Sequence, residues 1–135
     1  MKNILITGGA GLVGTVLTKG LQDKYNVKIL DIKKADGVES HTGDISNLDS
    51  IMPAFKNIDT VVHLAGDRRV HGEWESILDN NIIGLYNIYE AARLSGVKRV
   101  IFASSQHATG GFYDVEPYSF ISKGEYEKLP KDYKP

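Results

Sequence analysis

The sequence predicts a doubly wound α/β fold, with a parallel sheet in the strand order 3-2-1-4-5 that is incomplete at its C-terminal side. Two observations predict it. Short apolar runs alternate with longer segments of helical periodicity along residues 2–104, a pattern that calls for parallel strands joined by right-handed crossovers. In addition, Gly8, Gly11 and Gly14 directly follow the first apolar run and open the first helical segment.

The first half of the pattern contains three expected strands and one long helix. Residues 2–7 are expected to form a buried strand, and residues 27–31 and 37–42 the second and third strands. Residues 12–24 are expected to form a helix between the first two strands. The apolar stripe of this helix comprises Leu12, Val13, Val16, Leu17 and Leu21.

The second half continues the alternation. Residues 46–56 are expected to form a helix that Ser46 caps, and residues 59–65 and 98–104 the fourth and fifth strands. A long helix over residues 73–94 lies between these two strands. Its stripe comprises Trp74, Ile77, Leu78, Asn81, Leu85, Ile88 and Ala92. Because a buried amide without partners is costly, Asn81 either bonds a gap in the backbone or faces a ligand cavity, and both can hold.

Bulk composition restricts the class of protein. The chain has 135 residues, of which 41% are hydrophobic and 24% charged, and its net charge is −1, so neither nucleic acid nor a membrane is an expected partner. Cysteine is absent, which excludes disulfides and cysteine-based metal sites, and no metal site is expected. These features lead us to expect a cytoplasmic protein.

The domain organisation changes near residue 112. Residues 1–111 carry the α/β pattern, whereas residues 112–135 hold four of the seven tyrosines and three of the four prolines without a clear period. We therefore expect an irregular tail that leads into a C-terminal half outside this sequence.

The three glycines predict a Rossmann-type turn that binds a dinucleotide. The first glycine permits the sharp turn, the second lets a pyrophosphate approach the backbone, and the third lets the helix pack closely. Asp31 ends the next apolar run, 23 residues after Gly8, where a carboxylate can accept hydrogen bonds from an adenosine ribose. The alternative is a glycine-rich turn without a ligand.

Four further residues lie near expected strand ends. Asp44 could accept a hydrogen bond from an adenine amino group or cap the following helix. His63 lies in an apolar run, where a hydrogen-bonded core histidine is favoured over a metal ligand or an acid–base catalyst. Ser104 and Ser105 end the fifth strand, where a hydroxyl could contact a substrate oxygen or serve only the turn.

These motifs together resemble the NAD-dependent epimerase/dehydratase family, also called the extended short-chain dehydrogenase/reductases. The resemblance covers residues 1–113 and is carried by TGGAGLVG at 7–14, Asp31, GDI at 43–45, HLAG at 63–66, NNIIGLYNIYEAAR at 80–93 and VIFASS at 100–105. Within the family, the segments after residue 80 look most similar to the uronate dehydrogenase branch. That branch oxidises hexuronic acids with NAD.

The resemblance implies NAD as the cofactor and a sugar acid or nucleotide sugar as the substrate. It implies Ser105 as the catalytic serine, with Ser105, Gln106 and His107 on the substrate side. The cofactor-binding residues that it implies are Gly8, Gly11, Leu12, Val13, Gly14, Asp31, Ile32, Asp44, Ile45, Leu64, Ala65, Gly66, Asn81 and Ser104.

The sequence departs from the family at its catalytic base, a tyrosine followed by a lysine four residues later. No tyrosine here has a lysine at that spacing; Lys123 lies five residues after Tyr118, about 100° further around a helix. We therefore expect an NAD-binding portion of a dehydrogenase or epimerase that is inactive by itself. The alternative is a non-catalytic dinucleotide sensor, complete as it stands. We also expect self-association or a homodimer through the long helix and the fifth strand.

Overall fold

The computed structural model describes residues 1–69, 71–105 and 113–132, which fall into two units, residues 1–103 and 104–135. The strands of the first unit are β1 (Asn3–Thr7), β2 (Asn26–Asp31), β3 (Glu39–Thr42), β4 (Thr60–His63) and β5 (Arg99–Phe102). Its helical segments are α1 (Leu12–Leu21), α2 (Leu48–Ile51), the 3-10 turn η1 (Met52–Phe55), α3 (Trp74–Ile77), the π-helical turn η2 (Leu78–Ile83) and α4 (Gly84–Leu94).

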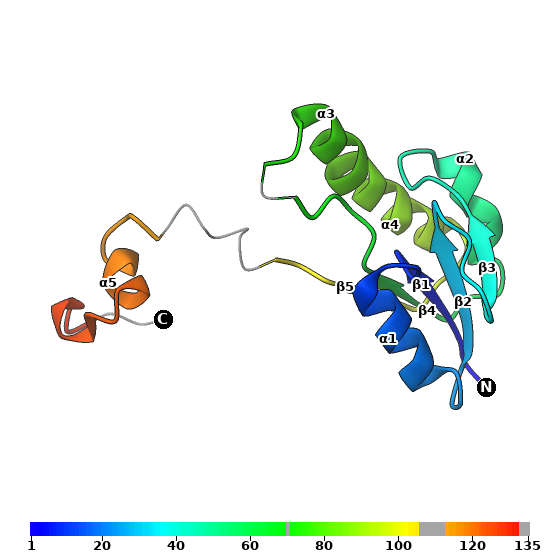
Figure 1. The fold of residues 1–135 in the computed structure, drawn as a ribbon, viewed down its shortest axis with the longest axis horizontal. Coiled ribbons are helices and arrows are strands. Elements are labelled where there is room, and N and C mark those ends of the chain that lie inside the picture. Colours follow the sequence, from blue (N-terminus) through cyan, green and yellow to red (C-terminus); the bar gives the residue numbers. More distant parts are fainter. Residues whose placement is uncertain (70, 106–112, 133–135) are drawn as a thin grey trace. The chain divides into compact units, whose positions relative to one another are not determined.

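The five strands form one parallel sheet in the order β3-β2-β1-β4-β5, which confirms the predicted fold class (Figure 1). Thr7 at the end of β1 is paired with Leu30 on one side and His63 on the other. His63 is paired in turn with Phe102. The carboxyl ends of the strands therefore reach the same edge of the sheet, where the loops that follow them meet.

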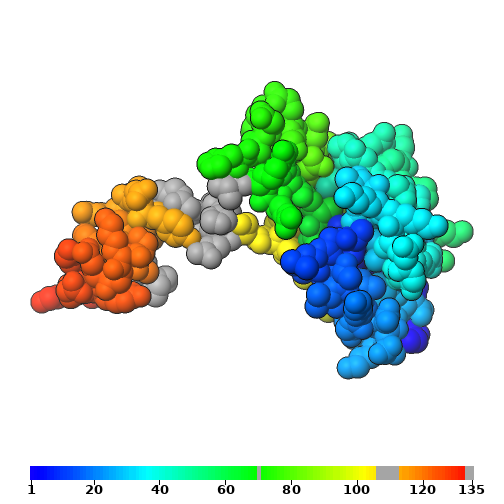
Figure 2. Space-filling view, viewed as in Figure 1, coloured from blue at the N-terminus to red at the C-terminus, as the bar shows by residue number. Residues whose placement is uncertain are grey.

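Alternating side chains divide the core between the two faces of the sheet. One cluster contains Leu5, Leu30 and Val61 with the buried side chains of α2, η1 and α4. The other contains Ile4, Ile6 and Val62 with partly buried side chains of α1. Helix α1 thus covers one face and α2 and α4 the other, and the blue, cyan and green segments pack into one body (Figures 1 and 2).

The expected apolar stripe of the first helix is only partly the buried one. Leu17 and Leu21 pack against the sheet, but Leu12, Val13 and Val16 are exposed by 63–78%. The buried residues of α1 are Gly14 and Thr18. The helix lies so close to the glycine turn that its smaller residues face inward, and the larger residues of its first turn face outward.

Three further expectations need correction. Asn47, not Ser46, caps α2, because the Asn47 side chain accepts a hydrogen bond from the Ser50 N–H at 3.1 Å. The helix over residues 73–94 is not uniform, since η2 inserts a π-helical turn between α3 and α4. Trp74, placed on the stripe, is 61% exposed, whereas Asn87 is buried and donates to the Ile45 carbonyl at 2.8 Å.

The second unit contains α5 (Tyr118–Ser122) and the 3-10 turn η4 (Tyr126–Lys128). Tyr118 begins α5 and Lys123 is its C-cap residue, so the two lie at opposite ends of a short helix. Among the described residues of the chain, no helix is both long enough and apolar enough to span a membrane.

Candidate functional site

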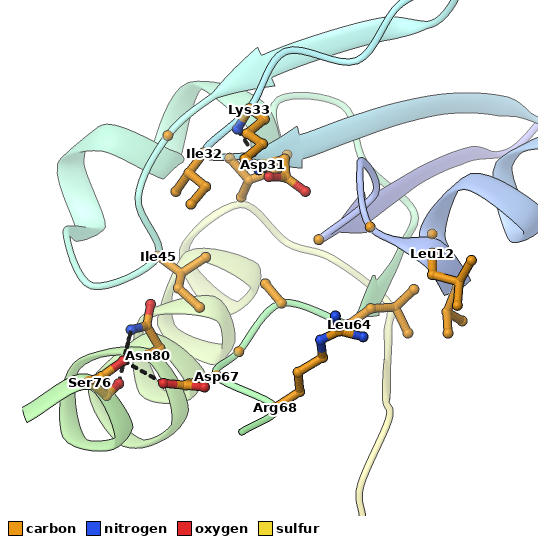
Figure 3. Close-up of a pocket in the computed structure, with 18 of the residues that line it drawn as sticks. Leu12, Asp31, Ile32, Lys33, Ile45, Leu64, Asp67, Arg68, Ser76 and Asn80 are labelled. Atoms are coloured by element: carbon orange, nitrogen blue, oxygen red, sulfur yellow. Dashed lines mark hydrogen bonds between the residues drawn. The ribbon is translucent and has the colours of Figure 1, made fainter. Parts of the chain in front are cut away.

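A cavity of about 810 Å³ lies in the first unit, at the carboxyl ends of the strands (Figure 3). Its wall combines the glycine turn, the loops after β2, β3 and β4, and residues of α3 and η2. This volume falls within the range of about 300–1,000 Å³ that small-molecule sites occupy. In open parallel sheets, ligands bind at this edge, where the strand order reverses.

Two glycines of the turn are required by close packing. Gly8 has a φ of +69°, and a Cβ there would lie 2.7 Å from the backbone nitrogen of Ala65 in the loop after β4. A Cβ on Gly14 would lie 2.5 Å from the Cα of Gly9. The turn therefore joins β1 to α1 while it touches the end of β4, and the helix begins directly against it.

The N-terminus of α1 presents free backbone donors beside this turn. Gly11 is the N-cap residue, no side chain caps the helix, and its first turn holds no acidic residue. The first bond to the Gly11 carbonyl comes from the Thr15 N–H at 2.9 Å, so the N–H groups of Leu12, Val13 and Gly14 have no intrahelical acceptor. All three residues line the cavity, which makes this wall suited to a phosphate group.

Asp31 lies at the end of β2 in the same wall. Its Oδ2 accepts a hydrogen bond from the Ala10 N–H of the glycine turn, and its Oδ1 accepts one from the Lys33 N–H, both at 3.0 Å. These two bonds fix the carboxylate relative to the turn. Each oxygen keeps a lone pair for a further donor, such as a ribose hydroxyl.

His63 is a buried core residue, as its apolar surroundings in the sequence indicate. Its Nδ1 lies 2.6 Å from Thr7 Oγ1, and its ring stacks on Phe102 with the centroids 5.6 Å apart. Burial lowers the pKa of His63 to about 4. The ring is therefore neutral near pH 7, and it does not line the cavity.

The loop after β4 brings three charged residues to the cavity that the sequence analysis did not single out, namely Asp67, Arg68 and Arg69. The Arg69 guanidinium binds the Asp67 carboxylate, which holds the pKa of that carboxyl well below its usual range. Ser76 Oγ adds a bond to Asp67 Oδ2 at 2.6 Å. Arg68 has no ion pair with any described residue, and in Figure 3 it extends from Asp67 toward Leu64 and Leu12.

The structure places most of the residues implied as cofactor-binding in one wall. Those that line the cavity are Gly8, Gly11, Leu12, Val13, Gly14, Asp31, Ile32, Ile45, Leu64, Ala65 and Gly66. Lining residues that sequence reasoning missed are Leu30, Lys33, Gly43, Asp67, Arg68, Arg69, Ser76 and Asn80. The consecutive charges of Asp67, Arg68 and Arg69 directly after HLAG were the available signal for three of them.

The other implied residues lie elsewhere. Asp44 is exposed, and its Oδ1 accepts the Ser46 N–H at 2.9 Å in the turn before α2. Asn81 bonds the backbone of Asp67, which is the first of the two roles expected for it. Ser104 and Ser105 are exposed residues of the second unit, and Gln106 and His107 lie outside the described residues.

The wall fits a dinucleotide in three respects. Free N–H groups at the start of α1 suit a pyrophosphate, and Asp31 suits the hydroxyls of an adenosine ribose. Ile32 and Ile45 offer apolar contacts near Asp31 for a base (Figure 3). The cavity lies at the reversal of strand order, between β1 and β4.

Comparison with known proteins agrees with this geometry. A family model described as the NAD dependent epimerase/dehydratase family matches residues 4–131. A uronate dehydrogenase from Pseudomonas syringae pv. tomato is 36% identical over an alignment 140 positions long, which covers 96% of this chain and 50% of that protein. An L-arabinose 1-dehydrogenase (NAD(P)(+)) from Haloferax volcanii is 36% identical over 107 residues, which cover 79% of this chain and 42% of that protein.

Solved structures show the same likeness. The crystal structure of a mutant of uronate dehydrogenase from Agrobacterium tumefaciens in complex with NAD is 38% identical, with a TM-score of 0.73 over 79% of this chain and 42% of that one. The chain therefore spans half or less of the length of the relatives that it matches.

Proposed function

The chain belongs to the NAD-dependent epimerase/dehydratase family, and we propose that it forms the NAD-binding part of a uronate dehydrogenase-like oxidoreductase. The substrate we propose is a sugar acid or a nucleotide sugar. The observation that carries the proposal is the wall that joins free N–H groups of α1 to the fixed carboxylate of Asp31.

Each part of this wall has a proposed role. The N–H groups of Leu12 and Val13 would donate to the pyrophosphate, and Arg68 would add a positive charge beside it. Asp31 would accept from the adenosine ribose. The bonds from Ala10 and Lys33 keep the Asp31 carboxylate in place before a ligand arrives.

When bound, NAD would supply at nicotinamide C4 the acceptor for a hydride from a carbinol carbon of the substrate, and the substrate hydroxyl would give its proton to a base. Ser105 is the residue that we propose donates a hydrogen bond to that substrate oxygen. A positioned base for the proton contributes about 10²–10⁴-fold to the rate of such steps. Because no tyrosine in this sequence has a lysine four residues later, we propose that residues 1–135 bind NAD but do not turn substrate over.

Calorimetric titration with NAD, followed by an assay with glucuronate and galacturonate, tests both parts. We expect saturable NAD binding and no NADH formation above background. Absence of NAD binding would contradict the proposed site. Turnover would instead show that another pair, such as Tyr118 and Lys123, supplies the base.

A dinucleotide sensor is the second candidate, favoured by the lack of a tyrosine–lysine pair. The coding sequence downstream of residue 135 separates the two. A continuing reading frame with a tyrosine and a lysine four residues apart supports the enzyme, and a native stop codon supports the sensor.

A further inference from the structure

We propose that Asn81 is a positioning residue that holds the loop after β4 in the shape that NAD binding requires, although its own side chain does not line the cavity. This inference rests on the proposed function, because NAD is the ligand whose affinity reports the shape of the loop.

The Asn81 amide engages both backbone polar groups of one loop residue. The Asp67 N–H donates to Asn81 Oδ1 at 2.6 Å, and Asn81 Nδ2 donates to the Asp67 carbonyl at 2.9 Å. An amide that meets both groups of one residue fixes that residue's position and orientation together. The amide satisfies the backbone N–H and carbonyl of Asp67, as a neighbouring strand would satisfy those of an extended segment.

The residue before Asp67 shows how closely the amide approaches. A Cβ on Gly66 would lie 2.9 Å from Asn81 Oδ1, so a larger residue would push the loop and η2 apart. Leu64, Ala65 and Gly66 all form part of the cavity wall. The amide therefore sets where this part of the wall stands.

The Asp67 side chain supplies a second attachment for the same loop. Arg69 Nε and the Arg69 N–H both donate to Asp67 Oδ1 at 3.0 Å, and the Asp67 side chain is only 7% exposed. Ser76 Oγ on α3 donates to Asp67 Oδ2 at 2.6 Å. Two independent sets of bonds thus tie one loop residue to α3 and η2.

Two neighbouring residues of the π-helical turn η2 serve this arrangement. Asn81 bonds the loop backbone, while Asn80 lines the cavity and donates to the Ser76 carbonyl at 2.9 Å. These bonds hold Asp67 and the residues before it in position before a ligand binds, so binding does not bear the cost of ordering them. Without Asn81, that cost would appear as lost affinity.

The test compares Asn81→Ala with Asn3→Ala in the full chain. Asn3 is a matched control, because its amide donates to the Asn57 carbonyl at 2.6 Å at the amino end of β1, away from the cavity. We expect Asn81→Ala to weaken NAD binding about tenfold or more and to speed hydrogen exchange of the Asp67 amide. Asn3→Ala should lower the melting temperature and leave NAD affinity unchanged.

Asn81→Asp covers the case in which the alanine variant fails to fold. It keeps an acceptor for the Asp67 N–H but loses the donor to the Asp67 carbonyl, so an intermediate loss of affinity is expected. Faster Asp67 exchange with unchanged NAD affinity would overturn the positioning role. So would weaker affinity with unchanged exchange, which would mean that Asn81 contacts NAD itself. If the wild-type chain does not bind NAD, the proposed function is wrong, and the positioning role that rests on it is wrong as well.

Discussion

Asp31 should set the preference for NAD over NADP. Its carboxylate would accept from a free 2′-hydroxyl and repel a 2′-phosphate, while Lys33 and Lys34 beside it reduce that repulsion. We expect Asp31→Ala to lose about tenfold in NAD affinity and to narrow the gap to NADP. Calorimetric titration with NAD and with NADP measures the two affinities and the difference between them.

Asp31→Asn is the control, because it keeps an acceptor for the Ala10 N–H but removes the charge. If the wild-type chain binds NADP more tightly than NAD, the assignment of Asp31 is wrong.

His63 should make the fold sensitive to acid. Burial lowers its pKa from 6.5 to about 4, so the unfolded chain takes up a proton at a higher pH than the folded chain does. The contribution of neutral His63 to the free energy of unfolding is fully present above pH 6.5. It is lost as the pH falls toward 4, by about 3 kcal/mol in total.

Urea unfolding across this pH range measures the effect. His63→Asn, which places a non-titrating polar atom near Thr7, should flatten the profile between pH 6.5 and 4. If the unfolding free energy of the variant falls with pH as steeply as that of the wild type, other groups dominate the acid response.

Sequence reasoning at the residue scale succeeded where a residue's chain neighbours decide its surroundings. The apolar run around His63 indicated a core residue, and Asp31 ends a strand whose place follows from periodicity. It failed for Asp67 and Arg69, because their pairing depends on a loop that α3 and η2 hold from outside. Nothing in the neighbouring sequence indicates that Arg69 is paired with Asp67, whereas Arg68 has no ion pair among the residues that the structure describes.

At the scale of elements, Gly14 should control how α1 meets the glycine turn. An alanine Cβ there would lie 2.5 Å from Gly9 Cα and 2.6 Å from the Gly8 carbonyl oxygen, so the helix must move away. We expect Gly14→Ala to cost about 1–3 kcal/mol of unfolding free energy and to weaken NAD binding. Thermal unfolding and NAD titration measure the two effects.

Gly20 provides the matched control in the same helix, since a Cβ there would meet nothing within 4 Å. Gly20→Ala should stabilise the chain by about 0.5–1 kcal/mol and leave NAD binding unchanged. Equal effects of the two substitutions would contradict the packing argument.

Strands β1, β2 and β4 were predictable because buried parallel strands read as short apolar runs, but the faces of the helices were only partly so. Leu12, Val13 and Val16 look like a core stripe, yet Gly14 and Thr18 face inward because close contact with the glycine turn selects small residues. The π-helical turn η2 leaves no sign in apolar periodicity. The backbone of the structure shows this turn, from which Asn80 and Asn81 bond different groups.

For the whole molecule, the strand order followed from the alternation and the position of the glycine turn alone. The cavity followed too, since the order reverses between β1 and β4. Its side walls did not follow, because they depend on where the loop after β4 is attached. The unit of residues 1–103 also carries exposed apolar side chains on the helix α4 and on the edge strand β5.

Those groups lead us to expect self-association. β5 ends the sheet as described, with Ile101 49% and Phe102 44% exposed, and on α4 Tyr86 and Tyr89 are 66% and 47% exposed. An apolar edge strand offers unpaired backbone groups to another chain. Light scattering over a concentration series should show dimers or larger species. Ile101→Lys should reduce them if the edge pairs, and Tyr86→Lys if the helix does. A monomer at high concentration would show that neither surface binds a second copy.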